Sequence, residues 1–194
     1  MGLDLGTGGL VGSVSLQLGS GQFYVFQTPG TGPQKIGYAV LTASNPVVAG
    51  TAVFTQRLVG QAEGQNLYEA GVAATLARRK FSIFVDSIGA SDTGLALVNA
   101  NDGEATITLR LYDLDFNLLA EKQISLAAGQ HLPRFVNQLF DGNVATQAKE
   151  MRGVLTVESD LPIAAVTLRQ KDAQYPDNVP TLTTFPVIAG VREP

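Results

Sequence analysis

Apolar and polar residues alternate with a period of two along much of the chain. In “EATITLRLYD” (104–113), Ile107 and Leu109 are each flanked by polar residues, and “KFSIFVDS” (80–87) and “GSVSLQL” (12–18) follow the same pattern. Successive side chains of a strand point to opposite faces, so this period predicts strands with one buried and one exposed face. Turn clusters rich in Gly, Asn, Asp and Pro separate these runs. Short strands at this spacing predict an antiparallel sandwich or barrel.

The evidence for helices is confined to one segment. “PRFVNQLF” (133–140) places Phe135, Leu139 and Phe140 on one helical face, after a proline suited to a first helical turn. “NLYEAGVAATLARR” (66–79) has a weaker helical pattern, which Gly71 and the β-branched residues disfavour. We therefore expect an all-β chain with one short helix.

An internal repeat sets the expected domain organisation. “SNPVVAGTAVFTQ” (44–56) matches “SDLPIAAVTLRQ” (159–170) when Pro46 is aligned with Pro162 and Gln56 with Gln170. Two copies of one supersecondary motif account for this repeated sequence. The sequence thus predicts two antiparallel β-sandwich domains in tandem, and the resemblance described below implies that they are immunoglobulin-like. An abbreviated copy spans 1–78, and a complete copy with the short helix spans 79–194.

The first copy has counterparts only to the later strands of the second. In the second copy, alternation and turn signals predict strands at 80–86, 94–100, 104–113, 117–126, 130–133, 152–158, 163–170 and 181–188. A sandwich without its opening strands would expose unpaired edges, which natural proteins avoid. Two explanations remain open. The chain is a fragment or a compact small domain, or another subunit donates a strand to complete the first copy.

Composition narrows the classes of function. Of 194 residues, 45% are hydrophobic and 15% charged, without a membrane-spanning apolar run, so we expect a globular protein with no membrane insertion. The net charge is −4, and no basic cluster exceeds Arg78-Arg79-Lys80, which argues against nucleic-acid binding. Without cysteine and with His131 as the single histidine, thiolate chemistry and typical zinc sites are excluded. We expect no enzyme activity and no cofactor.

Two groups of residues are candidate sites. Asp113, Asp115 and Asn117 in “YDLDFN” have the alternating oxygen spacing of a calcium loop, although Asp and Asn are also what tight turns require. Phe23, Tyr24 and Phe26 are expected on both faces of one strand, because neighbouring strand residues point opposite ways.

One face of that aromatic strand must contact something other than its own core. A carbohydrate platform, a subunit interface and an inter-domain contact are the alternatives. A protein interface is favoured, because sugar sites usually use tryptophan and the chain has none.

Three phrases carry a family resemblance: “TGLALVNAN” (93–101), “LAAGQHLPRFVNQLF” (126–140) and “GVLTVESDLPIAAVTLR” (153–169). The chain resembles the tandem immunoglobulin- or fibronectin-like β-sandwich modules of large secreted or cell-surface bacterial proteins. The resemblance covers nearly all of 80–190 and, more weakly, 12–76. It implies a spacer, adhesive or structural unit without enzymatic residues.

Two hypotheses follow, both placing the protein outside the cell or at its surface. In the first, the chain is a structural subunit of a surface assembly or filament, associating with itself or with other surface proteins. In the second, it is an adhesive or spacer module of a larger secreted protein and binds a glycan or a protein. Strand exchange between copies would favour the first hypothesis, and a stable monomer the second.

Overall fold

The computed structural model describes residues 3–4, 10–28, 36–45, 47–57, 66–171 and 181–190. The chain divides into two compact units, Met1–Gly37 and Tyr38–Pro194. The predicted boundary between the repeats, after residue 78, lies inside the second unit and stays a prediction. Within the described ranges, no helix has the length and apolar character needed to cross a membrane.

The first unit contains one short strand pair. β1 (Leu3–Asp4) and β2 (Leu10–Val11) are antiparallel. After them the chain turns where the Gln22 N–H donates to the Gly19 carbonyl oxygen at 3.1 Å. The structure has no strand over 12–18, so the strand predicted there is not confirmed.

The second unit contains a two-stranded hairpin. β3 (Thr51–Arg57) pairs antiparallel with β4 (Asn66–Ala73), which confirms a strand where the helical pattern was weak. In this hairpin Gln56 lies opposite Tyr68, and in the sandwich Gln170 lies opposite Leu182. Both pairs are antiparallel, and the organisation of the chain as two tandem copies stays a prediction.

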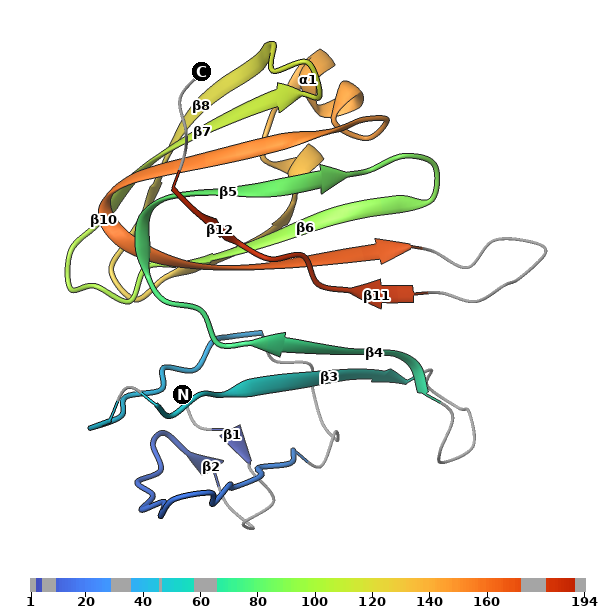
Figure 1. The fold of residues 1–194 in the computed structure, drawn as a ribbon. Coiled ribbons are helices and arrows are strands. Elements are labelled where there is room, and N and C mark those ends of the chain that lie inside the picture. The colour runs from blue at the N-terminus through green and yellow to red at the C-terminus, as the bar shows by residue number, and fades with distance from the viewer. Residues whose placement is uncertain are drawn as a thin grey trace. The chain divides into compact units, whose positions relative to one another are not determined.

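The rest of the second unit is an antiparallel β structure of two layers (Figure 1). Its strands are β5 (Arg78–Asp86), β6 (Ser91–Val98), β7 (Ala105–Asp113), β8 (Leu118–Leu126), β9 (His131–Phe135), β10 (Arg152–Lys171), β11 (Thr181–Thr183) and β12 (Ile188–Ala189). One layer has the order β12-β5-β10-β7-β8 and the other β11-β10-β6-β9. The mostly-β prediction is confirmed. The five strands predicted from 80–86 to 130–133 correspond to β5–β9, whereas two short strands, β11 and β12, stand where one was predicted over 181–188.

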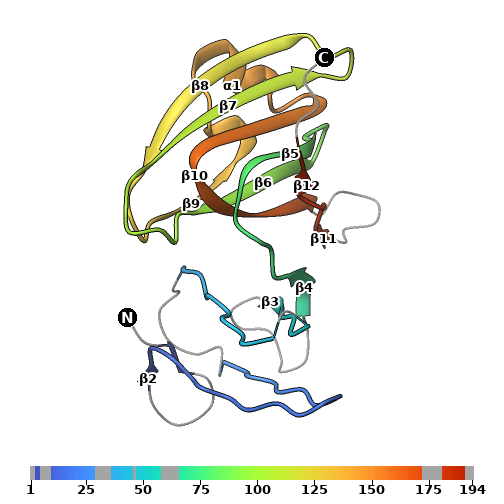
Figure 2. The ribbon, with the colours of Figure 1, turned by 60° about the vertical axis from the view of Figure 1, so that its left-hand side comes forward.

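β10 belongs to both layers. Figure 2 shows β10 curving from one layer into the other. Its first half pairs with β5 and β7, and its second half with β6 and β11, on either side of a register shift between Glu158 and Ile163. The prediction of two separate strands here is wrong. The “SDLP” segment bends the strand without ending it, because the Asn101 Nδ2 donates to the Pro162 carbonyl oxygen and the Thr106 N–H donates to Asp160 Oδ1, each at 2.8 Å.

The core lies between the two layers. Inward-facing residues of β7 are completely buried and alternate with half-buried ones, as period two predicts. The largest fully buried side chains are Phe81, Ile83, Leu95, Leu97, Ile107, Leu109, Leu111, Leu155 and Ile163, with Val85, Val136 and Val157. Burying each such side chain stabilises the fold by about 1.5–3 kcal/mol before entropy is counted. The outer face of the first layer instead carries cross-strand ion pairs, such as Lys80–Glu158 at 2.7 Å.

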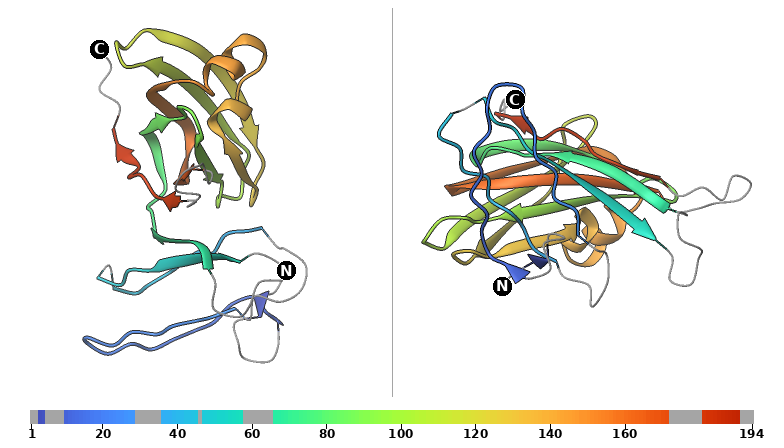
Figure 3. Two further views of the ribbon diagram at one scale, coloured as in Figure 1. Left: turned by 90° about the vertical axis from the view of Figure 1, so that its right-hand side faces the viewer. Right: turned by 90° about the horizontal axis from the view of Figure 1, so that it is seen from below.

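The helix predicted at 133–140 is in the wrong place. Pro133 lies in β9, which pairs only with β6 among the described residues and so tolerates a proline on its outer edge. One 3₁₀ turn follows (Val136–Gln138), and the α-helix α1 spans Gly142–Gln147 (Figure 3). Leu139 and Phe140 are buried in the core as expected, but from a connection between the layers and not from a helix.

Gly153 of β10 provides a test of this packing. The residue pairs with Val85 on one side and Asp113 on the other, and a Cβ added to it would collide with the backbone carbonyl oxygen of Tyr112. We expect Gly153→Ala to lower the free energy of unfolding by about 1–3 kcal/mol, as overpacking does, measured by urea denaturation. Gly103→Ala is the control, since its Cβ would meet only the Leu161 side chain at 3.7 Å. Equal effects of the two substitutions would contradict the close approach.

Candidate functional site

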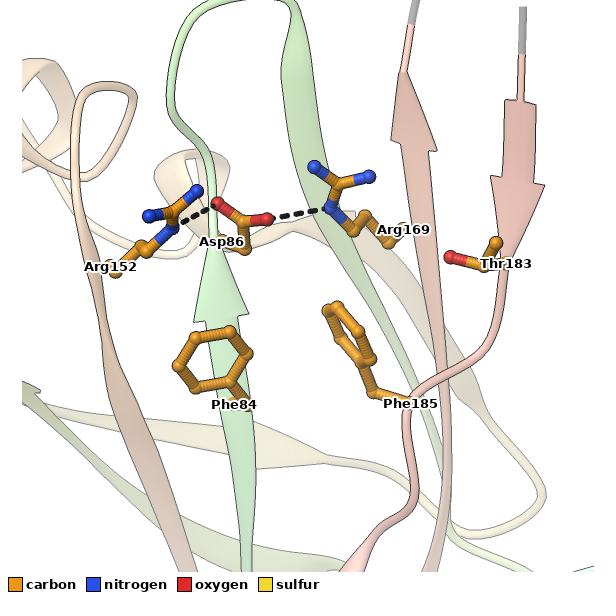
Figure 4. A pocket seen from close by; sticks show the side chains of 6 residues that line it. All are labelled: Phe84, Asp86, Arg152, Arg169, Thr183 and Phe185. Atoms are coloured by element: carbon orange, nitrogen blue, oxygen red, sulfur yellow. Dashed lines mark hydrogen bonds and ion pairs between the residues drawn. The ribbon is translucent and has the colours of Figure 1, made fainter.

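An open hollow of about 470 Å³ lies where β5, β10 and β11 meet (Figure 4). Asp86 ends β5, and the first and second halves of β10 contribute one arginine each. The lining residues are Phe84, Asp86, Arg152, Arg169, Thr183 and Phe185. Side chains from three strands and one connecting segment therefore line the hollow.

Asp86 bridges the two arginines. Arg152 Nε donates to Asp86 Oδ1 at 3.0 Å, and Arg169 Nε donates to Asp86 Oδ2 at 2.8 Å. The Asp86 side chain is only 10% exposed, whereas that of Arg152 is 51% exposed. Such charge-assisted hydrogen bonds are about twice as strong as neutral ones. The ion pairs tie the end of β5 to both halves of β10.

Hydroxyl groups of β6 form hydrogen bonds with Asp86 and with Arg169. The buried Thr93 Oγ1 accepts a hydrogen bond from the Asp86 N–H at 2.9 Å and donates to the Asp86 carbonyl oxygen at 3.0 Å. Arg169 Nη2 donates to Ser91 Oγ at 2.7 Å. The backbone of Asp86 and the guanidinium of Arg169 are thus both fixed by neighbouring polar groups.

Two phenyl rings form the apolar part of the hollow. Phe84 and Phe185 meet edge to face, with ring centroids 5.6 Å apart and an interplanar angle of 74°. Phe185 is held by Thr167, whose hydroxyl donates to the Phe185 carbonyl oxygen at 2.5 Å and accepts from its N–H at 3.2 Å. The aromatic wall is therefore anchored to the second half of β10.

The hollow carries an excess of positive charge. Burial raises the pKa of Asp86, but hydrogen bonds from Arg152 and Arg169, together with their charges, outweigh it and hold the pKa below its ordinary value of 3.8. One ionised carboxylate then faces two guanidinium groups. Within the described part of the chain, the structure gives partners to Nε of Arg152 and to Nε and Nη2 of Arg169, and to no other nitrogen of either group.

The predicted calcium residues form a hydrogen-bonded turn. Asp113 Oδ1 accepts from the N–H groups of Asp115 and Asn117, and Asp113 Oδ2 accepts from Asn117 Nδ2, each at 2.9 Å. These bonds hold Phe116 in the left-handed region at φ 61° and lower the pKa of Asp113. In the described ranges, no three His, Cys, Asp or Glu side chains are grouped to hold a metal.

The predicted aromatic interface residues are exposed. Phe23 is 85% exposed, Tyr24 56% and Phe26 39%, and the rings of Tyr24 and Phe26 lie with centroids 4.8 Å apart. They lie in a segment that the structure does not assign to a strand. Their role as an interface stays a prediction.

The sequence patterns did not indicate the hollow. Asp86 and the two arginines look like ordinary polar positions on half-buried strands. One signal is visible when “GYAVLTAS” (37–44) is set against “RGVLTVES” (152–159) and Gln56 against Gln170. Gly37 and Thr55 of the first copy then stand where the second copy has Arg152 and Arg169, so in this alignment the two arginines occur in the second copy only.

No family model matches the chain, and no curated protein matches it. Similar solved structures include Thermotoga maritima 1070, with a TM-score of 0.43 and 15% identity, covering 59% of this chain and 98% of that one. The Anabaena sensory rhodopsin transducer matches with a TM-score of 0.37 and 14% identity, covering 48% of this chain and 98% of its own. Likenesses this distant carry no functional argument, and the resemblance to immunoglobulin-like or fibronectin-like modules stays a prediction.

The ion pairs of Asp86 predict a dependence of stability on pH. A carboxyl whose pKa is lowered by folding stabilises the protein above its unfolded pKa, and this contribution disappears as the pH falls through the folded value. We expect Asp86→Asn to lower the free energy of unfolding by about 1.5–3 kcal/mol near neutral pH. The difference from the native chain should shrink as the pH falls from 3.8 through the lower folded pKa.

Urea denaturation of both proteins from pH ~7 to ~2.5 measures this difference. Asp102→Asn, in the exposed turn after β6, is the control and should leave the pH profile unchanged. A constant deficit of the Asp86→Asn protein at every pH would show that the ion pairs do not contribute in this way.

Proposed function

We propose that the protein is a non-enzymatic, extracellular structural protein, a β-sandwich subunit that joins copies of itself through strand addition at β3. The observation that carries the proposal is the open edge of this strand. In the aligned part of the second copy, β10 pairs with β11 on one edge and with β6 on the other. β3 pairs with β4 alone among the described residues. Among the described residues, no strand of the first copy pairs with β3 as β6 pairs with β10, which supports the interpretation of this copy as an abbreviated sandwich.

The direction of the backbone groups supports pairing at this edge. The Ala74 N–H donates to the carbonyl oxygen of Gly50, opposite it, at 2.8 Å. Hydrogen-bonded and non-hydrogen-bonded pairs alternate along an antiparallel ladder. The N–H and C=O groups of Thr51, Val53 and Thr55 therefore point away from β4. They form the row of donors and acceptors that an added strand would use.

Exposed apolar side chains on the same strand add to the argument. Val53 is 62% exposed and Phe54 50% exposed, and these neighbours lie on opposite faces of the hairpin. A two-stranded hairpin is at best marginally stable in water. Pairing of two β3 strands across a two-fold axis would give a four-stranded sheet and cover part of both faces. The partner that fits the edge is therefore a second copy of the chain.

The second candidate function is an adhesive or spacer module of a larger secreted protein. The specific observation in its favour is the hollow around Asp86, because arginine and aromatic side chains together are typical of binding sites. The extracellular location of either candidate rests on the cysteine-free composition and on the resemblance to secreted modules. The two candidates are separable, because they use different strands.

Assembly is tested by removing one outward N–H group. We expect the native chain to form dimers or larger species in size-exclusion chromatography with light scattering. Val53→Pro should shift it to a monomer, because proline cannot donate to an added strand but leaves the β3–β4 hydrogen bonds intact. A monomeric native chain at all concentrations would overturn the proposal.

A matched control separates loss of pairing from loss of the hairpin. Ala52 faces β4 in the same ladder, so Ala52→Pro removes a hydrogen bond within the hairpin. This variant should lose protection of the β4 amides in hydrogen exchange, whereas Val53→Pro should retain it. Loss of protection in both variants would mean that Val53→Pro disrupts the fold, and Val53→Lys would then serve as the edge-blocking change.

A further inference from the structure

We propose that the hollow of Phe84, Asp86, Arg152, Arg169, Thr183 and Phe185 binds the carboxylate of an apolar C-terminal residue of a peptide. This inference deepens the second candidate function and rests on it, but it does not depend on assembly through β3.

The charge of the hollow favours a monoanion. Two guanidinium groups surround the single carboxylate of Asp86, which leaves one positive charge uncompensated. A carboxylate neutralises that charge. A phosphate dianion would leave an excess negative charge beside Asp86, and like charges a few ångströms apart repel.

The arginines are already positioned to donate. Asp86 accepts from Nε of each arginine, so the guanidinium planes are fixed before any ligand arrives. Groups held in their bound geometry lose less entropy on binding. Arg152 is half exposed, and its terminal nitrogens have no partner among the described residues.

The phenyl rings favour a ligand with an apolar group next to its carboxylate. Figure 4 shows Phe84 and Phe185 on the same side of Asp86, next to the ion pairs. Apart from the charged groups, Thr183 is the only polar residue that lines the hollow. The phenyl rings offer no hydrogen-bond partner to the hydroxyl groups of a sugar ring. An aromatic or aliphatic side chain instead packs on the rings.

The test uses N-acetyl-Gly-Gly-Phe as the free acid and as the C-terminal amide, titrated into the monomeric Val53→Pro chain and the native chain by calorimetry. We expect the acid to bind about tenfold more tightly than the amide, as one charge-assisted interaction implies. Binding of the acid to both chains would show that the hollow binds its ligand whether or not the chain assembles through β3. The experiment thus distinguishes a failure of the binding proposal from a failure of the assembly proposal. Equal binding of acid and amide, or no binding at millimolar acid, would overturn the inference.

Variants locate the binding. Arg152→Gln should weaken binding of the acid about tenfold and leave the amide unchanged. Phe84→Ala keeps both ion pairs and should weaken N-acetyl-Gly-Gly-Phe more than N-acetyl-Gly-Gly-Gly. Arg134→Gln, on β9 outside the hollow, is the charge-matched control and should have no effect. Stronger binding of glucuronate than of the peptide acid would assign the hollow to acidic sugars and overturn the peptide assignment.

Discussion

The hydrogen bonding of β10 on both of its edges is the constraint on which the sandwich depends. One strand of 20 residues supplies a central position in each layer and changes layers at a bend. The core side chains of both layers are thereby held by one continuous backbone. The close approach at Gly153 and the meeting of two arginines at Asp86 are both consequences of this shared strand. Removing β10 would therefore open both layers and expose the core between them.

Much of the second copy could be predicted because one face of each strand lies in the core. Burial then forces the period of two that Phe81, Ile83 and Val85 show. The misplaced helix shows the limit of this reasoning. The spacing of Phe135, Leu139 and Phe140 fits one face of a helix, and it fits a strand followed by a turn equally well. Packing between the layers decides between these two structures. Local spacing carries no information on that packing.

The candidate site could not be predicted for a related reason. Asp86, Arg152 and Arg169 are far apart in the sequence, and each one alone looks like a solvated position on a strand. They meet because of the register of β5 on β10 and the bend within β10, which tertiary pairing sets. The calcium residues illustrate the opposite case. The spacing of Asp113, Asp115 and Asn117 could be seen in the sequence, and it is typical of a tight turn as well as of a calcium loop. In the structure, hydrogen bonds within the turn occupy both carboxylate oxygens of Asp113.

The open edge of β3 also limits how far an assembly can grow. Each molecule has a single β3, so contact through this edge has a valence of one. Two copies paired about a two-fold axis use both edges and close the contact. Growth into a filament would require a second, different contact on each copy, arranged head to tail. The exposed aromatic residues at 23–26 are the described apolar group that could supply it.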